Sequence, residues 1–239
     1  MTSREVVRLR DSSICRKEAD LYLLVRGSVP VPEVLHVEPS LVLRYVEGIT
    51  FQELQACGDA EAIAQAARSA GEALAAIHRF AFERPGWIAP GPTVTDGIGP
   101  LPEFVEERLS RSRAPAELRE RVGKRMRLAA ADLQELQRDS HLAHGDFNGA
   151  NLIVRREDGR WRVVAVIDWE FAVSSTPLMD IGNFLRHGDV PGFIEGYCEA
   201  GAVLPAGWRH LARLVDVAAL AQLATQGRDD AIQMLAAIV

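Results

Sequence analysis

The feature that most constrains the fold is a pair of apolar runs separated by an Asp-Gly dipeptide. The segment NLIVRREDGRWRVVAVID begins at Asn151 and ends at Asp168, and its turn falls at Asp158 and Gly159. Asp-Gly between apolar runs is the strongest short-range signal for a β-hairpin, because both residues tolerate the positive φ of a tight turn. Antiparallel pairing returns the two ends of the segment to the same place. The sequence therefore predicts a buried hairpin with polar residues at its open end.

The open end of this hairpin is a candidate metal site. With a two-residue turn, Asn151 pairs with Val166, and Asp168 becomes the diagonal neighbour of Asn151 on the same face. Diagonal neighbours in a sheet lie about 7–8 Å apart, which lets an amide oxygen and a carboxylate converge on one ion. Hard oxygen donors suit Mg²⁺, which keeps several waters and shares the phosphates of a substrate. We therefore predict Asn151 and Asp168 as magnesium ligands.

The loop that leads into the hairpin, HGDFNGAN, starts at His144. Gly, Asn and Asp are common turn residues, so a surface turn is one interpretation. The other interpretation is chemical, with Asp146 as a base five residues before Asn151. Such a pair is common by chance, but its combination with an apolar hairpin that ends in Asp168 is far more specific. This is the arrangement of phosphoryl transfer, in which one Asp accepts a hydroxyl proton while an Asn and a second Asp hold metal on the phosphates.

The composition of the chain narrows the class of protein. Its 239 residues are enough for one large domain or two lobes. The net charge of −6 argues against broad nucleic-acid binding and is compatible with a cationic substrate. The start is charged and is not a signal peptide, and no apolar run reaches membrane-spanning length. Cys15, Cys57 and Cys198 are far apart, which indicates reduced thiols in a cytoplasmic protein.

The secondary-structure signals change character along the chain. Residues 5–46 contain short β-branched runs and one helix, CRKEADLYLLVRG, for which Gly27 is the expected C′ residue. The later parts show apolar residues at helical spacing. A helix expected over residues 115–136 has a basic face that includes Lys124 and Arg125. We interpret this face as solvated rather than as a nucleic-acid surface, because no aromatic residues are interleaved to stack bases.

Three stretches resemble the aminoglycoside phosphotransferase and choline kinase family, which has a protein-kinase-like fold: HGDFNGANLIV, VIDWEFA and LMDIGNFL. Upstream, EVVRL, RKEADLYLLVRGSVPVPEVLH and LVLRYVEG are similar to that family's third N-lobe strand, the following helix and the hinge that receives adenine. The resemblance runs from about Glu5 to Arg186. It implies an α+β, two-lobed fold. Residues 1–47 would form a small β-rich N-lobe on the nucleotide side, and residues 48–239 a larger, mainly helical C-lobe with the catalytic loop and the metal-binding hairpin.

The resemblance assigns roles to individual residues. It implies Asp146 as the catalytic base and agrees with Asn151 and Asp168 as magnesium ligands. His144 is expected to brace the loop rather than to react. We interpret Asp180 as the N-cap of the helix in LMDIGNFL and as a brace, not as a reacting group.

The nucleotide-binding residues follow from the same resemblance. Arg8 stands where the family normally has the phosphate-binding Lys of the third strand, and Glu18 matches the helix glutamate that orients this cation. Arg can clamp a phosphate bidentately, but it is not equivalent to Lys. Backbone groups of Arg44 and Val46 are expected to meet adenine. Glu170 either faces the cleft, where it could support a substrate, or pairs with a nearby Arg.

One departure from the family concerns the phosphate loop. The family normally has two strands and a glycine-containing loop before its third strand. This sequence starts at the third strand and contains neither GxGxxG nor GxxxxGK[ST]. A late start codon, a trimmed kinase and a loss of catalysis would each account for the difference. A third strand left partly unpaired would also favour a homodimer.

The expected function is a small-molecule kinase that uses ATP (or GTP) and Mg²⁺ and transfers the γ-phosphoryl group to a substrate hydroxyl. The alternative is a catalytically weak or inactive pseudokinase-type protein that binds nucleotide. A protein kinase is disfavoured because only WEFAVSSTPLM separates Asp168 from Asp180, and a hydrolase because the sequence contains no GxSxG. Aminoglycosides, choline-like amines, sugars and macrolides all remain open as acceptors.

Overall fold

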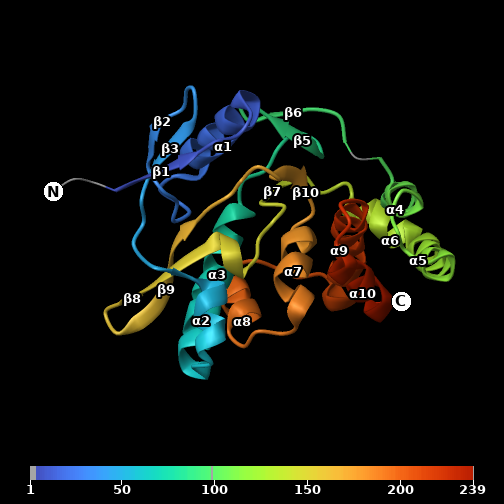
Figure 1. The fold of residues 1–239 in the computed structure, drawn as a ribbon. Helices are drawn as coiled ribbons and strands as arrows, with labels where there is room; N and C mark the ends of the chain where they lie inside the picture. The colour runs from blue at the N-terminus through green and yellow to red at the C-terminus, as the bar shows by residue number, and fades with distance from the viewer. Residues whose placement is uncertain (1–3, 98, 239) are drawn as a thin grey trace.

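The computed structural model describes residues 4–97 and 99–238. It shows helices combined with small antiparallel sheets (Figure 1), so the expected α+β class is confirmed. The N-terminal strands lie at one side of the molecule, and the C-terminal helices lie at the opposite side. None of the helices in the described residues combines the length and the hydropathy needed to span a bilayer.

The N-terminal sheet has the strand order β1-β3-β2. Its strands are β1 (Glu5–Arg8), β2 (Val34–His36) and β3 (Leu41–Arg44). The strands expected in EVVRL and LVLRYVEG are thus present. β1 lies at one edge of the described sheet, and its Val6 and Val7 are 40% and 55% exposed.

Helix α1 (Ser12–Val25) follows β1 and packs beside β2 and β3. It begins after Asp11, whose side chain accepts a hydrogen bond from the Ser13 amide and so caps the helix. It ends where Gly27 adopts a left-handed conformation with a φ of 91°, as expected for a C′ glycine. The buried face of α1 carries Glu18, which brings this side chain to the site described below.

Helix α3 (Ala60–Ile77) and helix α8 (Phe193–Glu199) pack with their backbones almost in contact. A Cβ atom on Gly71 would stand 2.0 Å from a carbonyl oxygen of α8, and a Cβ atom on Gly196 would stand 2.1 Å from a carbonyl oxygen of α3. Neither distance leaves room for a side chain in a close-packed interior. The two helices therefore depend on glycine at both positions.

The predicted hairpin is present as β8 (Leu152–Glu157) and β9 (Arg160–Val166). Its turn falls at Asp158 and Gly159, which both have positive φ as the sequence predicts. The short strand β4 (Ile49–Thr50) pairs with the other edge of β8. This arrangement attaches the hairpin to the segment that follows the N-terminal sheet.

The register of the hairpin differs from the prediction by one residue. Near the turn the strands pair as expected, but a β-bulge places one extra residue in β9, so that Leu152 rather than Asn151 pairs with Val166. Asn151 instead lies beside Ile167, whose amide donates to the Asn151 carbonyl oxygen at 3.0 Å. The predicted diagonal relation between Asn151 and Asp168 is therefore wrong in register. Both residues still emerge at the open end of the hairpin.

A four-stranded sheet with the order β6-β5-β10-β7 sets two chemically important segments side by side. Its strands are β5 (Gly86–Ala89), β6 (Thr93–Val94), β7 (His141–Ala143) and β10 (Val173–Ser175). β7 runs directly into the HGDFNGAN loop, and β10 follows the segment that begins at Asp168. Because β7 and β10 are antiparallel, the loop and this segment meet at the same end of the sheet.

The remaining elements build the C-terminal part and one short helix near the hairpin. They are α2 (Phe51–Cys57), α4 (Leu101–Ser110), α5 (Ala116–Leu128), α6 (Ala130–Leu136), η1 (Gly149–Asn151), α7 (Leu178–Phe184), η2 (Leu185–His187), α9 (Trp208–Thr225) and α10 (Asp229–Ile238). The helix expected over residues 115–136 is broken at Ala129 into α5 and α6. Helix α7 has Pro177 at its N-cap position, so the expectation that Asp180 caps it is wrong. The Asp180 carboxylate accepts its hydrogen bonds from another loop.

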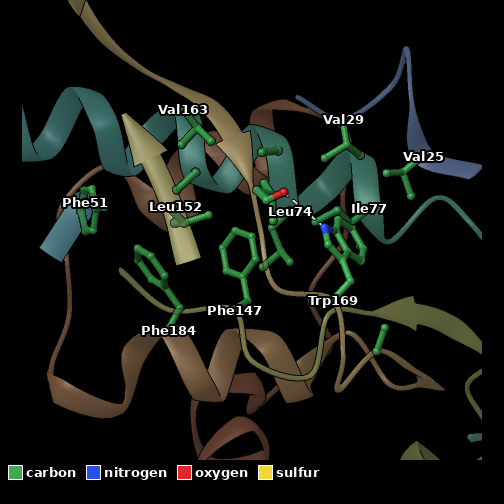
Figure 2. Packing of buried hydrophobic residues seen from close by; sticks show 14 of the residues in the cluster. Val25, Val29, Phe51, Leu74, Ile77, Phe147, Leu152, Val163, Trp169 and Phe184 are labelled. Atoms are coloured by element: carbon green, nitrogen blue, oxygen red, sulfur yellow. Dashed lines mark hydrogen bonds between the residues drawn. The ribbon is translucent and has the colours of Figure 1, made fainter. Parts of the chain in front are cut away.

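One hydrophobic cluster joins residues from both ends of the chain (Figure 2). It contains Val25 from α1, Leu74 and Ile77 from α3, and Trp169 from the segment after β9. Trp169 is fully buried, and its indole N–H donates to the Val166 carbonyl oxygen at 3.2 Å. Burial of a large aromatic side chain contributes strongly to stability. The packing therefore fixes the N-terminal elements against the segment that carries Asp168.

Candidate active site

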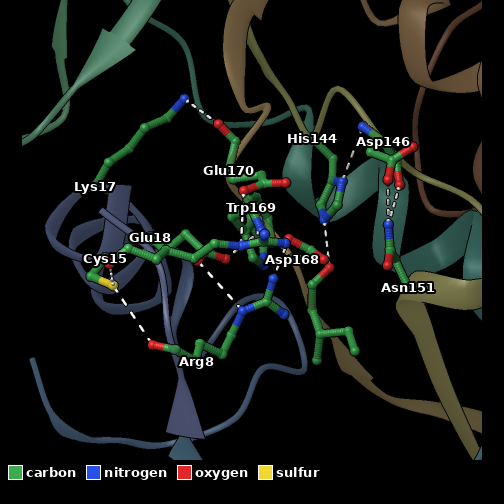
Figure 3. A network of polar contacts seen from close by, with 12 residues as sticks. Arg8, Cys15, Lys17, Glu18, His144, Asp146, Asn151, Asp168, Trp169 and Glu170 are labelled. Carbon is green, nitrogen blue, oxygen red and sulfur yellow. Dashed lines mark hydrogen bonds and ion pairs between the residues drawn. The ribbon is translucent and has the colours of Figure 1, made fainter. Parts of the chain in front are cut away.

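The loop between β7 and β8 holds Asp146 by both carboxylate oxygens, and Figure 3 shows the contact with Asn151. Asn148 Nδ2 donates to Asp146 Oδ1, and Asn151 Nδ2 donates to Asp146 Oδ2, each at 2.8 Å. Burial raises the pKa of Asp146, and these two hydrogen bonds oppose the shift because they favour the carboxylate. The carboxylate is therefore oriented by its own loop, which is what a general base requires.

Asn151 ends the 3₁₀ turn η1 and is buried. Its side-chain nitrogen donates to the Asp146 carbonyl oxygen as well as to Asp146 Oδ2, both at 2.8 Å. These bonds use the nitrogen and orient the Asn151 side chain, so its oxygen is the atom that can face a ligand. The predicted base and one predicted metal ligand are thus in direct contact.

Asp168 follows β9 in a left-handed backbone conformation, with a φ of 69°. This conformation is uncommon for a residue with a side chain and persists where the surroundings impose it. The Asp168 amide donates to the Tyr22 hydroxyl at 3.2 Å, and the next amide, that of Trp169, donates to Glu18 Oε1 at 2.9 Å. Helix α1 therefore holds the turn that positions the Asp168 carboxylate.

Arg8 joins Asp168 to Glu18 (Figure 3). Its guanidinium group lies 2.5 Å from Asp168 Oδ1 and 3.7 Å from Glu18 Oε2. Burial lowers the pKa of Arg8, but the close contact with the Asp168 carboxylate and the charge of Glu18 outweigh this effect, so the pKa of Arg8 is raised. Burial raises the pKa of Glu18 despite the charge of Arg8. The structure thus brings together Arg8 and Glu18, which the family resemblance assigns as the phosphate-binding cation and the glutamate that orients it.

The oxygen atoms at this point fit a magnesium ion. Asp168 Oδ1 is buried and has no well-aligned hydrogen bond within the described part of the chain, so its contact with Arg8 is an ion pair. This carboxylate oxygen and the side-chain oxygen of Asn151 are hard donors of the kind that Mg²⁺ prefers. Among residues 4–97 and 99–238, no three His, Cys, Asp or Glu side chains gather as a metal site. Nucleotide phosphates and water would therefore have to complete the coordination.

Lys17 and Arg10 contact the segment that follows Asp168. Lys17 Nζ donates to the carbonyl oxygens of Glu170 and Ala172, each at 2.8 Å. The Glu170 carboxylate pairs with Arg10 at 3.3 Å, which is the second of the two placements considered for Glu170. Burial lowers the pKa of Lys17 to about 8. No local pattern marks Lys17, because its contact with Glu170 joins residues 153 positions apart.

Asp180 and His144 hold the loop from the side of α7. Asp180 Oδ2 accepts from the His144 amide at 2.7 Å, and Asp180 Oδ1 accepts from the Gly145 amide at 2.9 Å. His78 Nε2 lies 3.1 Å from the same carboxylate. The His144 ring lies 3.0 Å from the Ile167 carbonyl oxygen, and burial lowers its pKa, which keeps the ring neutral near pH 7. Asp180 is thus placed as a brace, and His144 is enclosed by the protein.

Gly145 brings the loop into contact with the segment after Asp168. Its φ is 79°, and a Cβ atom there would stand 2.2 Å from the Phe171 carbonyl oxygen. The positive φ favours glycine, and the close approach excludes any side chain. The close approach fixes the distance between the strand end that carries Asp146 and the segment that carries Asp168.

Arg44 ends β3, and Val46 lies in the connection between β3 and β4. The Arg44 amide donates to the Glu33 carbonyl oxygen at 2.8 Å, so the sheet already uses that donor. The Arg44 side chain pairs with the Glu33 carboxylate at the surface. An adenine contact at Arg44 would therefore use its carbonyl oxygen, and the roles of both residues stay predictions.

A charged pair that the sequence did not indicate lies beside the base. Arg186 donates to both carboxylate oxygens of Asp216, at 2.9 and 2.6 Å, and both side chains are largely buried. The charge of Arg186 also lowers the pKa of Asp146, against the larger effect of burial. The partners lie 30 residues apart on different elements, so no local signal could have identified the pair.

A cavity of about 700 Å³ lies among β5, β10, α4 and α6. Volume alone would favour it as a binding site. None of the predicted site residues lines it. We place the candidate active site at Asp146 instead, because the oriented carboxylate and the two oxygen donors for a metal lie there.

Comparisons with known proteins identify the family of the chain. The profile of a phosphotransferase enzyme family matches residues 3–214, which include Asp146, Asn151 and Asp168. The chain belongs to this family. No curated protein sequence gives a significant match.

Solved structures extend the relation to the three-dimensional fold. Aminoglycoside phosphotransferase APH(4)-Ia has a TM-score of 0.72 at 18% identity, over 99% of this chain and 86% of that one. A choline/ethanolamine kinase family protein from Mesorhizobium loti has a TM-score of 0.66 at 18% identity, over 98% and 80%. Macrolide 2'-phosphotransferase MphH from Brachybacterium faecium has a TM-score of 0.64 at 19% identity, over 99% and 84%. This kinase-like phosphotransferase fold is therefore the fold of the chain. A thermostable mutant of APH(4)-Ia forms a ternary complex with ADP and hygromycin B.

Proposed function

We propose that this phosphotransferase is a small-molecule kinase that transfers the γ-phosphoryl group of ATP (or GTP) to a substrate hydroxyl with the help of Mg²⁺. The observation that carries the proposal is the contact of Asp146 with Asn151, which lies at the same end of the hairpin as Asp168. A protein that only binds nucleotide has no need of an oriented base. The family match and the nucleotide complex of a fold neighbour support the same function.

Each side chain has a separate task in this proposal. Asp146 accepts the proton of the acceptor hydroxyl, and its raised pKa makes it a stronger base than an exposed aspartate. Asn151 and Asp168 would hold the metal ion, which would supply charge neutralisation on the transferring phosphates. Arg8, kept in position by Glu18, would contact phosphate oxygens.

The two lobes divide the substrates in the same proposal. Residues 1–47 form the nucleotide side, where the Arg44 carbonyl oxygen and the Val46 amide meet adenine. Residues 48–239 carry the base and receive a small-molecule acceptor. The three described cysteines are free thiols, which supports a cytoplasmic location.

Calorimetry with AMP-PNP tests the metal assignment. The wild-type protein should bind the nucleotide more tightly with Mg²⁺ than without it, and Asp168→Ala should lose this dependence. Asp132→Ala, which removes an exposed carboxylate on α6, is the matched control and should keep it. Full magnesium-dependent affinity in Asp168→Ala would show that Asp168 is not a ligand.

Turnover tests the transfer itself. ADP release is measured across a panel of hydroxyl compounds, and acceptor-dependent release that Asp146→Asn abolishes would support the kinase. One observation favours the pseudokinase-type alternative: Arg8 pairs with the Asp168 oxygen that the metal needs. Magnesium-dependent nucleotide binding without turnover on any acceptor would support that alternative.

A further inference from the structure

A second cavity, of about 350 Å³, opens at the end of α7, against α9 and α10. We call it the arginine pocket after the charged side chains that line it. They are Arg125 from α5, Arg186 from η2, Arg209, His210, Arg213 and Asp216 from α9, and Asp189 from the loop after η2. Four arginines therefore face two aspartates. The pocket has an excess of positive charge although the whole chain is acidic.

Both acidic residues of the arginine pocket are already used. Asp216 accepts two hydrogen bonds from Arg186, and Asp189 accepts one from Arg209 at 2.6 Å. A new cation in the pocket would have to displace an arginine from one of these carboxylates. The two pairs leave no acidic group of the lining free to receive such a ligand.

Two of the arginines carry charge that the lining does not neutralise. Arg213 is exposed and has no carboxylate partner among the residues that the structure describes. Arg125 lies 3.5 Å from His210 Nδ1, and its buried Nε atom has no hydrogen-bond partner in the described part of the chain. A buried donor without an acceptor is unfavourable and indicates a missing partner. The missing partner of a guanidinium group is an anion or another strong acceptor.

The arginine pocket is connected to the catalytic loop through Arg186. In the orientation that satisfies its side chain, Asn183 donates to the Phe147 carbonyl oxygen and accepts from Arg186 Nη2, each at 2.9 Å. Phe147 is the residue after the base, so one hydrogen-bonded side chain separates the wall of the pocket from the loop. The charges of Arg186 and Asp146 also influence each other. The pocket therefore lies on the side of Asp146 that helices α7 and α9 form.

The charge of the arginine pocket selects among acceptor classes. Like charges brought together across an interface disfavour binding, so a polycationic aminoglycoside or a quaternary amine would meet an opposing field. Guanidinium groups match carboxylate and phosphate groups with paired, charge-assisted hydrogen bonds. The same surface is therefore suited to an acceptor that carries an anionic group in addition to its hydroxyl.

We propose that the arginine pocket receives the phosphoryl acceptor, and that this acceptor is a hydroxyl compound with a carboxylate or phosphate group bound by Arg125 and Arg213. The inference rests on the proposed kinase function and departs from the cationic substrate that the net charge allowed. In the transfer, the acceptor oxygen forms a bond to the γ-phosphorus, and the bond from that phosphorus to the β,γ-bridging oxygen breaks. ADP leaves with the electron pair, and the hydroxyl proton passes to Asp146.

A matched series of probes tests the charge preference. Dissociation constants for D-glucosamine, D-glucose, D-gluconate and glucose 6-phosphate are measured by calorimetry with saturating AMP-PNP and Mg²⁺. We expect gluconate or glucose 6-phosphate to bind about tenfold or more tightly than glucose, because a charge-assisted hydrogen bond is worth at least that factor. The two anions distinguish a carboxylate from a phosphate site. Equal affinities, weak binding by all four probes, or a preference for glucosamine would overturn the proposal.

Charge-reversal variants test which arginines cause the preference for an anionic acceptor. Arg213→Glu and Arg125→Glu should each weaken binding of the preferred anion about tenfold or more while leaving AMP-PNP affinity unchanged. Lys124→Glu is the control, because it makes the same change on an exposed residue of α5 outside the lining and should retain the preference. Equal losses in Lys124→Glu would assign the effect to overall charge and contradict the site. Failure of the wild-type protein to bind AMP-PNP would instead contradict the kinase function, whichever probe binds.

Discussion

The two sides of Asp146 are built in different ways. Towards α1, the segment from Asp168 to Ala172 is held by Tyr22, Glu18 and Lys17 through hydrogen bonds of 2.8 to 3.2 Å from side chains that are largely buried. Towards α5 and α9, the arginine pocket combines the largely buried pair of Arg186 and Asp216 with the exposed side chains of Arg209 and Arg213. The same base thus stands between a closely fixed region and an adaptable one.

This difference shows how geometry and specificity are separated in the chain. Phosphoryl transfer requires the base, the metal ligands and the phosphate cation to stay in place within a fraction of an ångström, and misplacement by about 1 Å can lower the rate about a hundredfold. Acceptor recognition depends on charge and shape at the surface, where substitutions usually change stability little. We therefore expect mutations on the two sides to have separable effects.

The largest effect should come from the base between the two regions. Asp146→Asn keeps the shape of the side chain but removes its capacity to take a proton, so turnover should fall about 10²–10⁴-fold. AMP-PNP affinity should stay nearly unchanged, because Asp146 is not assigned a nucleotide contact. Steady-state kinetics and calorimetry measure the two quantities. Turnover that is unchanged on a true acceptor would refute the role of Asp146.

The next largest effect should be on stability, and it should separate the brace at Asp180 from the rim of the arginine pocket. Asp180→Ala leaves the buried amide of His144 and the half-buried amide of Gly145 without their acceptor. An unsatisfied buried donor costs about 1–3 kcal/mol, so the free energy of unfolding, measured by urea denaturation, should fall by at least about that amount. Asp189→Ala on the rim of the arginine pocket breaks only an exposed pair and should change stability little. Similar losses in both variants would contradict the contrast between the buried brace and the exposed rim.

The pH dependence of kcat should sharpen the description of the base. Burial raises the pKa of Asp146 above its ordinary value. The base acts as a carboxylate, so kcat should be full above the raised pKa and fall as the pH drops through it. Asn148→Ala removes a hydrogen bond that favours the carboxylate, so its acid limb should lie at higher pH than that of the wild type. An acid limb that moves to lower pH in this variant would contradict the assignment.

The smallest effect concerns Lys17 on the fixed side. Its pKa is lowered by burial from 10.5 to about 8, so between these values the unfolded chain binds more protons at this group than the folded chain. The free energy of unfolding contributed by Lys17 should therefore rise with pH across this window. The free energy of unfolding of the wild type minus that of Lys17→Met, measured by urea denaturation from pH 8 to 10, should increase with pH. A Lys124→Met control on exposed α5 should show a constant difference, and parallel curves for Lys17→Met would contradict the burial of its amine.

Local patterns predicted the elements of the fixed region but not its contacts. The Asp-Gly turn and the apolar runs identified the hairpin, and the loop motif identified Asp146 and Asn151 as neighbours. The register was one residue off because a β-bulge leaves no signal in alternation when both strands are apolar. Asp180 was expected to cap a helix, which is the local preference of Asp. Its actual partners, His144 and Gly145, lie in another loop.

The adaptable region was harder to predict from the sequence. The basic face of α5 was interpreted as solvated because charged helix faces usually are, and this holds for the exposed Lys124. Arg125, the next residue, has a buried Nε atom beside α9. Helix periodicity gives the direction of a side chain but not which distant helix it meets. The pairing of Arg186 with Asp216 is unpredictable from the sequence for the same reason.

The close contact of α3 and α8 limits how descendants of this chain could diversify. Gly71 and Gly196 accept no larger residue without separating the two helices, so every substitution there would be removed by selection for folding before it could alter catalysis. Substitutions in related chains should therefore be rare at the α3–α8 contact. They should accumulate on α5 and α9, whose exposed residues tolerate replacement. A lineage that gains a new acceptor would be expected to change these helices while its α3–α8 glycines persist.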